Sequence, residues 1–129
     1  MELLYKEDTD KILKAFYTVY NALGYGFLEK VYENALFIEL CKFDLKVVKQ
    51  QPIKVQYDGQ KVGEYFADLI VNDVIIVELK ASEGIIEEHE HQLLNYLKAT
   101  DKEVGLLLNF GKKPQFKRKV FQNINKNLR

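Results

Sequence analysis

The segment that most constrains the fold of this chain is VIIVELK, residues 74–80. Its first four residues are apolar without alternation, as expected of a central strand that is covered on both faces. Glu78 and Lys80 follow, and their spacing of two places both side chains on the same face of the strand. A buried carboxylate is costly unless it is paired, hydrogen-bonded or bound to a cation. The segment therefore predicts either a salt bridge or a functional site.

Residue patterns on both sides of this segment predict three further strands. Residues 53–57 alternate between apolar and polar, and the Asp-Gly pair after them is a strong hairpin signal into a second strand over residues 62–71. An Asn-Asp pair then marks the turn into the central strand. Residues 104–110, VGLLLNF, have the apolar character of another buried strand.

Helical periodicity predicts three helices. Asp8 or Thr9 can cap the first helix, for which Gly24 is the stop signal. A second helix is expected over residues 27–41 and a third over residues 85–99. The predicted order is helix, helix, three strands, helix, strand, followed by a tail that could be an edge strand or a helix.

Composition favours one domain over residues 1–129, because 47% of the residues are hydrophobic, enough for a core without disulfides. Cys41 lies in an apolar, helix-like stretch without a partner cysteine, and we interpret it as a core thiol in a reducing compartment. No apolar run approaches the roughly 20 residues that span a bilayer, and the N-terminus lacks a basic segment followed by an apolar one. We therefore expect a cytoplasmic protein without membrane segments.

Charge is distributed unevenly although the net charge is zero. Residues 112–129 carry seven basic residues and no acidic one, which leaves 12 basic against 19 acidic residues before them. Such a segment is the expected footprint of a polyanion, but it is also common on a solvated terminus, so both readings stay open. The residues expected to contact nucleic acid are Lys112, Lys113, Lys117, Arg118 and Lys119.

Asp68 and Glu78 are the acidic candidates for a site, because they lie on two strands that the Asn-Asp turn should pair. Two such carboxylates can hold a hard cation such as Mg²⁺, and the Lys80 ammonium could orient an attacking water or offset charge on a phosphoryl oxygen.

The turn between the two strands decides whether the carboxylates can act together. A two-residue turn would place the carboxylates on opposite faces of the sheet, whereas a three-residue loop or a bulge would place them side by side on the same face. We therefore predict an odd loop or a bulge. Taken alone, the pattern favours a solvated or salt-bridged strand end.

Three blocks of sequence carry a resemblance to a known family. GFLEKVY, residues 26–32, has the pattern GxxExxY, and ADLIVNDVIIVELKA followed by HQLLNYLKAT matches the blocks that come after it. Over residues 22–111 the chain resembles the GxxExxY family, which is similar to the PD-(D/E)XK nuclease superfamily. The resemblance implies an α/β (α+β) fold with a restriction-endonuclease-like core, a mixed β-sheet flanked by helices in the order α-α-β-β-β-α-β.

The resemblance also implies roles for individual residues. Asp68 and Glu78 would be metal-binding carboxylates, Lys80 the catalytic lysine, Glu29 an additional metal-binding acid from a helix, and Gln92 a polar residue directed toward the site. The signature positions without an assigned role are Gly26, Tyr32 and Tyr96. Ala67 departs from the proline in the name of the superfamily, a position that tolerates change in the wider group.

Structural explanations remain open for several of these residues. Glu29 could simply stabilise the N-terminal turn of its helix, worth roughly 0.3–1 kcal/mol. Gln92 and Tyr96 could form a polar helix edge, and Gly26 could provide only backbone freedom. His89 and His91 lie on different helix faces, which makes them a poor metal pair.

The leading hypothesis is a Mg²⁺- or Mn²⁺-dependent nuclease that hydrolyses phosphodiester bonds of DNA or RNA. The alternative is a catalytically inactive module with the same fold that binds nucleic acid or a protein partner. A homodimer is one expected assembly, because small nucleases that cut both strands of a duplex commonly act as dimers.

Overall fold

The computed structural model describes residues 4–126 of the chain. Residues 127–129, part of the predicted basic segment, lie outside this range. The elements in chain order are α1 (Lys6–Leu23), α2 (Glu29–Cys41), β1 (Val47–Tyr57), β2 (Gln60–Val71), β3 (Ile75–Lys80), α3 (Glu87–Lys98), β4 (Val104–Phe110), β5 (Pro114–Val120) and a 3₁₀ turn (Asn123–Asn125).

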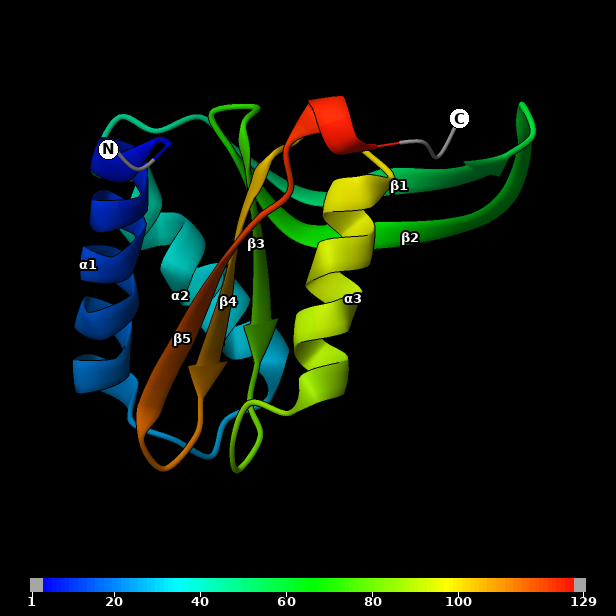
Figure 1. Ribbon diagram of the computed structural model, residues 1–129. Helices are drawn as coiled ribbons and strands as arrows, with labels where there is room; N and C mark the ends of the chain where they lie inside the picture. The colour runs from blue at the N-terminus through cyan, green and yellow to red at the C-terminus, as the bar shows by residue number, and fades with distance from the viewer. Residues whose placement is uncertain (1–3, 127–129) are drawn as a thin grey trace.

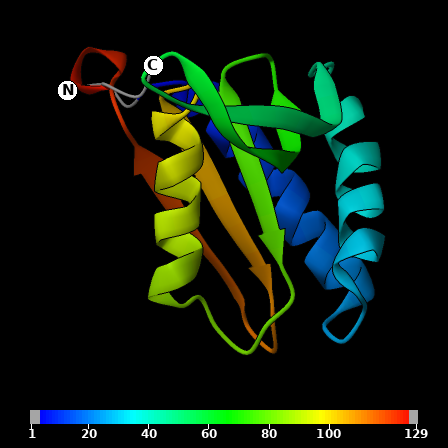
Figure 2. The same cartoon turned by 90° about the vertical axis from the view of Figure 1, so that its right-hand side faces the viewer.

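The five strands form one mixed sheet in the order β1-β2-β3-β4-β5. Among the described strands, only β3 and β4 pair in parallel, and α3 connects them. Figure 2 shows α3 on one side of the sheet and α1 and α2 on the other. The predicted mixed sheet with flanking helices, and the predicted element order, are confirmed.

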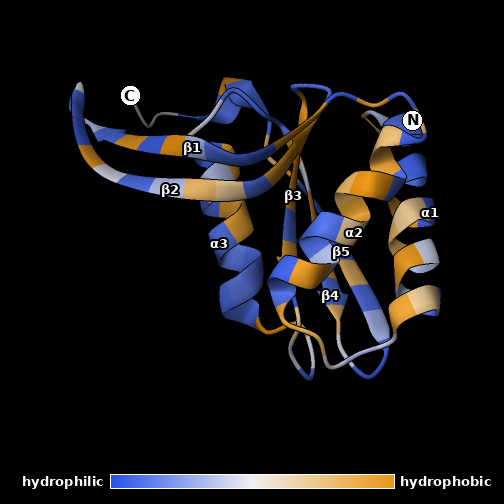
Figure 3. Cartoon of the chain, turned by 180° about the vertical axis from the view of Figure 1, so that it is seen from behind, coloured by the Kyte–Doolittle hydropathy of each residue, from blue (hydrophilic) through white to orange (hydrophobic). Residues whose placement is uncertain are grey.

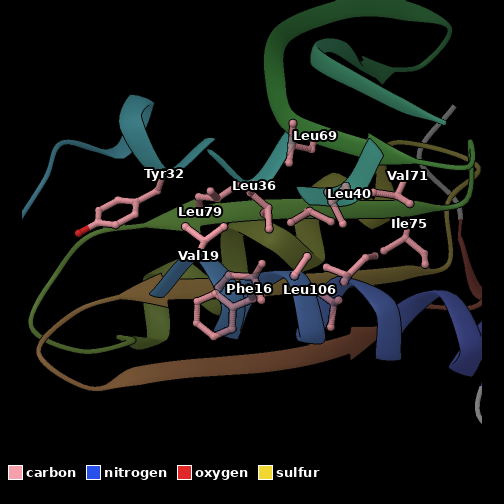
Figure 4. Packing of buried hydrophobic residues seen from close by; sticks show 14 of the residues in the cluster. Phe16, Val19, Tyr32, Leu36, Leu40, Leu69, Val71, Ile75, Leu79 and Leu106 are labelled. Atoms are coloured by element: carbon pink, nitrogen blue, oxygen red, sulfur yellow. The ribbon is translucent and has the colours of Figure 1, made fainter. Parts of the chain in front are cut away.

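The larger core lies between the sheet and the helices α1 and α2 (Figure 4). Phe16 from α1 and Leu36 from α2 are fully buried there against alternate residues of β3 and β4. Removing this apolar surface from water is the main term that stabilises the layers, at about 25 cal/mol per Å². The residues of β3 that face this core are Ile75, Val77 and Leu79.

The other face of β3 belongs to a smaller core beneath α3. Ile76 packs there with Leu93 and Leu97 of α3. Since side chains alternate along a strand, Glu78 and Lys80 share this α3 side with Ile76. The central strand is therefore apolar toward α1 and α2 along its whole length, and charged toward α3 only near its end.

β1 and β2 stay paired with each other along their length but diverge from β3, and their hairpin extends beyond α3 (Figure 1). Polar and apolar residues alternate along it, as Figure 3 shows by colour. Its tip is the predicted Asp58-Gly59 turn, in which both residues have positive φ, as a type I′ turn requires. Pairing of β2 with β3 extends only from Val71 to Leu69, so β2 parts from β3 at Asp68.

The connection between β2 and β3 has three residues. Asn72 and Asp73 both have left-handed backbones, Val74 N–H donates to Val71 O at 3.0 Å, and Val71 pairs with Ile75. Val74 is the additional residue that moves the register by one. The predicted odd loop is confirmed, and a regular two-residue turn is excluded.

Some details differ from the sequence predictions. Helix α1 begins at Lys6, so Asp8 and Thr9 lie inside it, and the Thr9 hydroxyl donates to Lys6 O instead of capping the helix. Cys41 is exposed, because it follows Leu40 by one residue and is turned away from the core. The interpretation of Cys41 as a core thiol was wrong. The basic tail forms the edge strand β5, which pairs with β4 at seven positions.

Tyr32 positions the loop between α1 and α2. Its hydroxyl donates to Gly24 O at 2.6 Å and accepts from Phe27 N–H at 3.2 Å, while its ring stacks on Phe110 at 4.2 Å. Within this loop Gly26 has φ +109°, a conformation that L side chains rarely adopt. Tyr32 and Gly26 therefore act together in shaping the entry to α2.

Tyr32→Phe should keep the stacking on Phe110 but lose both hydroxyl hydrogen bonds in a buried position. We expect it to lower the free energy of unfolding by about 1–3 kcal/mol, the cost of leaving buried partners unsatisfied. Urea unfolding measures this, with Tyr25→Phe as the control because Tyr25 is exposed. Equal stabilities of the two variants would contradict the structural role of Tyr32.

Candidate active site

The site lies where β2 parts from β3. The last pair of that ladder is Leu69 with Val77, so the next position sets Asp68 opposite Glu78. Asp68 Oδ2 accepts a 2.8 Å hydrogen bond from the backbone N–H of Leu79. The side chain of Asp68 thus takes a strand N–H that the departing backbone of β2 no longer pairs, and this bond holds the carboxylate beside Glu78.

Glu78 is a buried acid in an unfavourable electrostatic environment. It is 5% exposed, and its Oε1 atom has no hydrogen-bond partner among the described residues. Burial first, then the charge of Asp68 and a side-chain hydrogen bond with it, raise the pKa of Glu78 to about 10. The charge of Lys80 acts in the opposite direction. Without a cation, Glu78 therefore retains its proton at neutral pH.

Lys80 ends β3 on the same side as Glu78 and is half-buried. The turn that follows it is fastened by Asn109, the fully buried β4 residue that pairs with Lys80. Asn109 Oδ1 accepts from Ser82 N–H and its Nδ2 donates to Ser82 O, both at 3.0 Å. These two hydrogen bonds fix the position at which the chain leaves β3, and they therefore fix the direction of Lys80 at the end of the strand.

Helix α3 contributes Gln92 and Tyr96 to the same side of the sheet. Gln92 Nε2 donates to the Tyr96 hydroxyl at 2.9 Å. Burial first, then the charge of Glu78, raise the pKa of Tyr96 to about 12, with a smaller contribution from Asp68. Because its oxygen accepts from Gln92, the Tyr96 hydroxyl keeps its proton available as a donor near the two carboxylates.

Glu33 and Gln50 extend the site toward α2, and sequence reasoning missed both. Gln50 lies opposite Asp68 in the β1–β2 ladder, between the pairs Lys49–Leu69 and Gln51–Ala67, with a left-handed φ of +52°. Its Nε2 is 2.7 Å from Glu33 Oε1 and 3.4 Å from Asp68 Oδ1. Glu33 is only 4% exposed. A strained residue that bridges two acids is typical of a functional site.

Glu29 is the first residue of α2 and is exposed. Among the described residues, no three His, Cys, Asp or Glu side chains are gathered closely enough to hold a metal ion. The structure thus brings Asp68 and Glu78 together with Lys80, Gln92 and Tyr96, but does not gather Glu29 with the two strand acids. Glu33, one helical turn after Glu29, is the buried acid of α2.

The five basic residues of the tail have different environments. Lys112, Lys113 and Lys117 are exposed, the first two in the turn between β4 and β5. Lys119 forms an ion pair with Glu90 of α3. Arg118 points to the α1 side, where Nη2 donates to Leu4 O at 2.7 Å. The group is therefore split between both faces of the sheet.

The missed residues differ in the signal that they leave in the sequence. Asn109 is the one polar residue in the apolar run VGLLLNF, which marks it for a buried hydrogen-bonding role. Glu33 lies one turn after Glu29 and could have been considered with it. Gln50 leaves no signal, because its role depends on strand pairing.

A comparison with models of protein families places this chain in a superfamily. A sequence model of the PD-(D/E)XK nuclease superfamily matches residues 6–120. The chain therefore belongs to the PD-(D/E)XK nuclease superfamily.

Comparison with solved structures supports the fold. The crystal structure of SSO0001 is similar over 92% of this chain, with a TM-score of 0.60 and 17% sequence identity. The aligned region is 60% of that chain, so this protein spans somewhat more than half of its length. The search of curated proteins found no match. Among the described helices, none combines the length and apolar character needed to span a bilayer.

The raised pKa of Glu78 predicts how the stability of the metal-free protein depends on pH. The folded protein holds this proton up to about pH 10, whereas the unfolded chain releases it above its ordinary value of 4.5. Stability should therefore fall as pH rises between these values, by up to about 1.4 kcal/mol per pH unit. Urea unfolding in EDTA at pH 7 and pH 9 should show this decline, and Glu78→Gln should reduce it.

The control for this prediction is Glu83→Gln, which changes an exposed acid. Lysines lower the pKa values of the Glu64, Asp73 and Glu90 carboxyls, so those groups stay ionised over this range and contribute no slope. An identical decline in wild type and Glu78→Gln would show that Glu78 is not the group responsible.

Proposed function

We propose that this protein is a nuclease that hydrolyses phosphodiester bonds of DNA or RNA with Mg²⁺ or Mn²⁺, and that it belongs to the GxxExxY branch of its superfamily. One observation carries the proposal. Asp68 and Glu78 lie side by side on parting strands, and a carboxylate oxygen of Glu78 is buried without a partner. The same 129 residues are proposed to form one domain in the cytoplasm.

The donor set fits a hard divalent cation. Both side chains offer oxygen ligands, which Mg²⁺ and Mn²⁺ prefer. Burial and then the charge of Asp68 raise the pKa of Glu78, and a positive charge between the acids would offset both effects. We propose Asp68 and Glu78 as the residues that hold the ion. The role of Glu29 as a further ligand is implied by the sequence resemblance and stays a prediction.

A divalent ion at this position supplies Lewis-acid polarisation of a phosphoryl oxygen. The protein's own residues would then perform the remaining tasks. Lys80 is proposed to donate hydrogen bonds to the attacking water or to a phosphoryl oxygen as negative charge develops. Tyr96, held by Gln92, is proposed to donate its hydroxyl proton in a hydrogen bond to substrate. Gln50 and Glu33 are proposed to hold Asp68 in position.

Purified protein should cleave nucleic acid when Mg²⁺ or Mn²⁺ is added and should stop in EDTA. Lys80→Ala should lower the cleavage rate by about 10² or more, because the ammonium group would no longer stabilise the negative charge that develops in the transition state. Titration calorimetry with Mn²⁺ should detect a site that survives in Lys80→Ala and is lost in Asp68→Asn and Glu78→Gln. Absence of both cleavage and Mn²⁺ binding would contradict the proposal, and nucleic-acid binding without either would favour the inactive-module alternative.

The same calorimetry can separate the two acids of α2. We expect Glu33→Gln to weaken Mn²⁺ binding about 10-fold or more, as loss of a residue that supports a metal ligand commonly does. Glu29→Gln is the matched variant one turn earlier, and its exposed position predicts a smaller effect. A larger loss in Glu29→Gln would establish Glu29 as the helix-borne acid of the site.

The exposed lysines of the β4–β5 region are proposed to contact phosphates. Removing the whole basic segment would also remove β5 from the sheet, so neutral substitutions are the cleaner change. The triple variant with glutamine at Lys112, Lys113 and Lys117 should bind oligonucleotides more weakly. The slope of the logarithm of the binding constant against the logarithm of the salt concentration should become shallower by roughly 0.7–0.9 per lost phosphate contact. Lys42→Gln, at the C-cap of α2, is the control, and equal salt slopes in both variants would contradict a phosphate-binding role.

A further inference from the structure

An open pocket of about 510 Å³ lies between β2 and α3. Its size is within the range of roughly 300–1,000 Å³ that is typical of ligand sites. Tyr96 and Gln92, which have proposed roles toward substrate, form part of its wall, whereas its other lining residues have no role in the proposals above. The residues that line it include Tyr65, Glu88, His89, Gln92, Asn95 and Tyr96.

Two tyrosine rings form the aromatic part of this pocket. The ring centroids of Tyr65 and Tyr96 are 5.5 Å apart with an interplanar angle of 42°. Tyr96 is buried, whereas Tyr65 is 50% exposed. Tyr65 therefore presents ring surface to an incoming group, and flat aromatic ligands gain most from such a surface through stacking.

The charge of the lining selects the chemistry of the ligand. The described residues that line the pocket include one acid, Glu88, and two histidines, His89 and His91, but no lysine or arginine. The lining therefore lacks the permanently charged cations that commonly bind a phosphate group. The amides of Gln92 and Asn95 offer both donors and acceptors, which suit the polar edge of an uncharged heteroaromatic ring.

The pocket is connected to the carboxylates through Tyr96. Its ring forms one wall, and its hydroxyl accepts from Gln92. Tyr96 also belongs to the buried cluster that contains Ala67, the residue before Asp68, and Ile76, two residues before Glu78 on β3. A polynucleotide with its phosphodiester at Glu78 and Lys80 would therefore bring an adjacent nucleobase to this wall. A base that is stacked and paired inside a duplex cannot enter such a pocket without leaving the helix.

We propose that the pocket between Tyr65 and α3 is a subsite for one unpaired nucleobase, which makes single-stranded nucleic acid the preferred substrate. The inference rests on the proposed function for the phosphodiester at the acids. Recognition of the base itself rests on Tyr65 and Asn95, and on a lining in which no described residue is lysine or arginine. Stacking tolerates every base, so the subsite distinguishes single strands from duplexes and not one sequence from another.

The test measures binding by the full chain in EDTA, where no cleavage can occur. Fluorescence anisotropy would compare an oligonucleotide of about 12 nucleotides, its blunt duplex, and the same strand with abasic residues, a length within the usual range of single-strand sites. The intact single strand should bind at least about tenfold tighter than the other two probes. This comparison uses the unmodified protein and so does not depend on how any variant folds.

Variants then locate the effect. Tyr65→Ala should weaken single-strand binding about tenfold, Tyr65→Phe should retain it because the ring remains, and Asn95→Ala should give a smaller loss. The matched control is Tyr57→Ala, an exposed tyrosine near the tip of the same hairpin. Equal affinity for the single strand and the duplex, no dependence on bases, or equal losses in Tyr65→Ala and Tyr57→Ala would each overturn the subsite.

The two proposals can fail separately. Base-dependent binding that requires Tyr65, in a protein without metal-dependent cleavage, would retain the subsite and reject the nuclease. Metal-dependent cleavage with binding that ignores Tyr65 and the bases would retain the nuclease and reject the subsite.

Discussion

The hydrogen bond from the Leu79 N–H to the Asp68 carboxylate is the contact on which the site depends. A strand that leaves its neighbour in the middle of a sheet exposes backbone donors that must find partners. Here the partner is a side chain of the departing strand itself. The bond lets β2 turn away into the projecting hairpin while its carboxylate stays beside β3, which opens space on the α3 side without leaving that donor unpaired.

Ionisation of both acids in this position would oppose folding of the metal-free protein. A charged Glu78 would be buried and repelled by Asp68, and Lys80 would compensate it only in part. The other residues of β3 from Ile75 to Leu79 are apolar and buried in the two cores. The free-energy cost of burying an acid is therefore confined to one position of a well-packed strand. Proteins commonly retain such local conflicts where charge is needed for function, because the surrounding core stabilises the arrangement.

Much of the fold could be predicted because its signals are local. Apolar periodicity located all three helices and the first four strands, and Gly24 and the Asp58-Gly59 turn ended elements where expected. Because side chains alternate along a strand, Asp68 and Glu78 can share a face only if the loop between β2 and β3 has an odd number of residues. The pairing of Val71 with Ile75 shows such a loop. Exposure was less predictable, as Cys41 illustrates, because one step along a helix turns a side chain by about 100°.

By itself, the sequence determined the order of elements, the charged end of the central strand and the shared face of Glu78 and Lys80, because these follow from spacing along one element. Only the tertiary structure decided which partners surround them. Gln50 reaches Asp68 from β1 and connects it to Glu33 of α2. Asn109 of β4 holds the turn after Lys80, and Glu29 lies at the surface. The physical reason is that strand pairing and helix docking bring together residues whose separation in sequence carries no periodic signal.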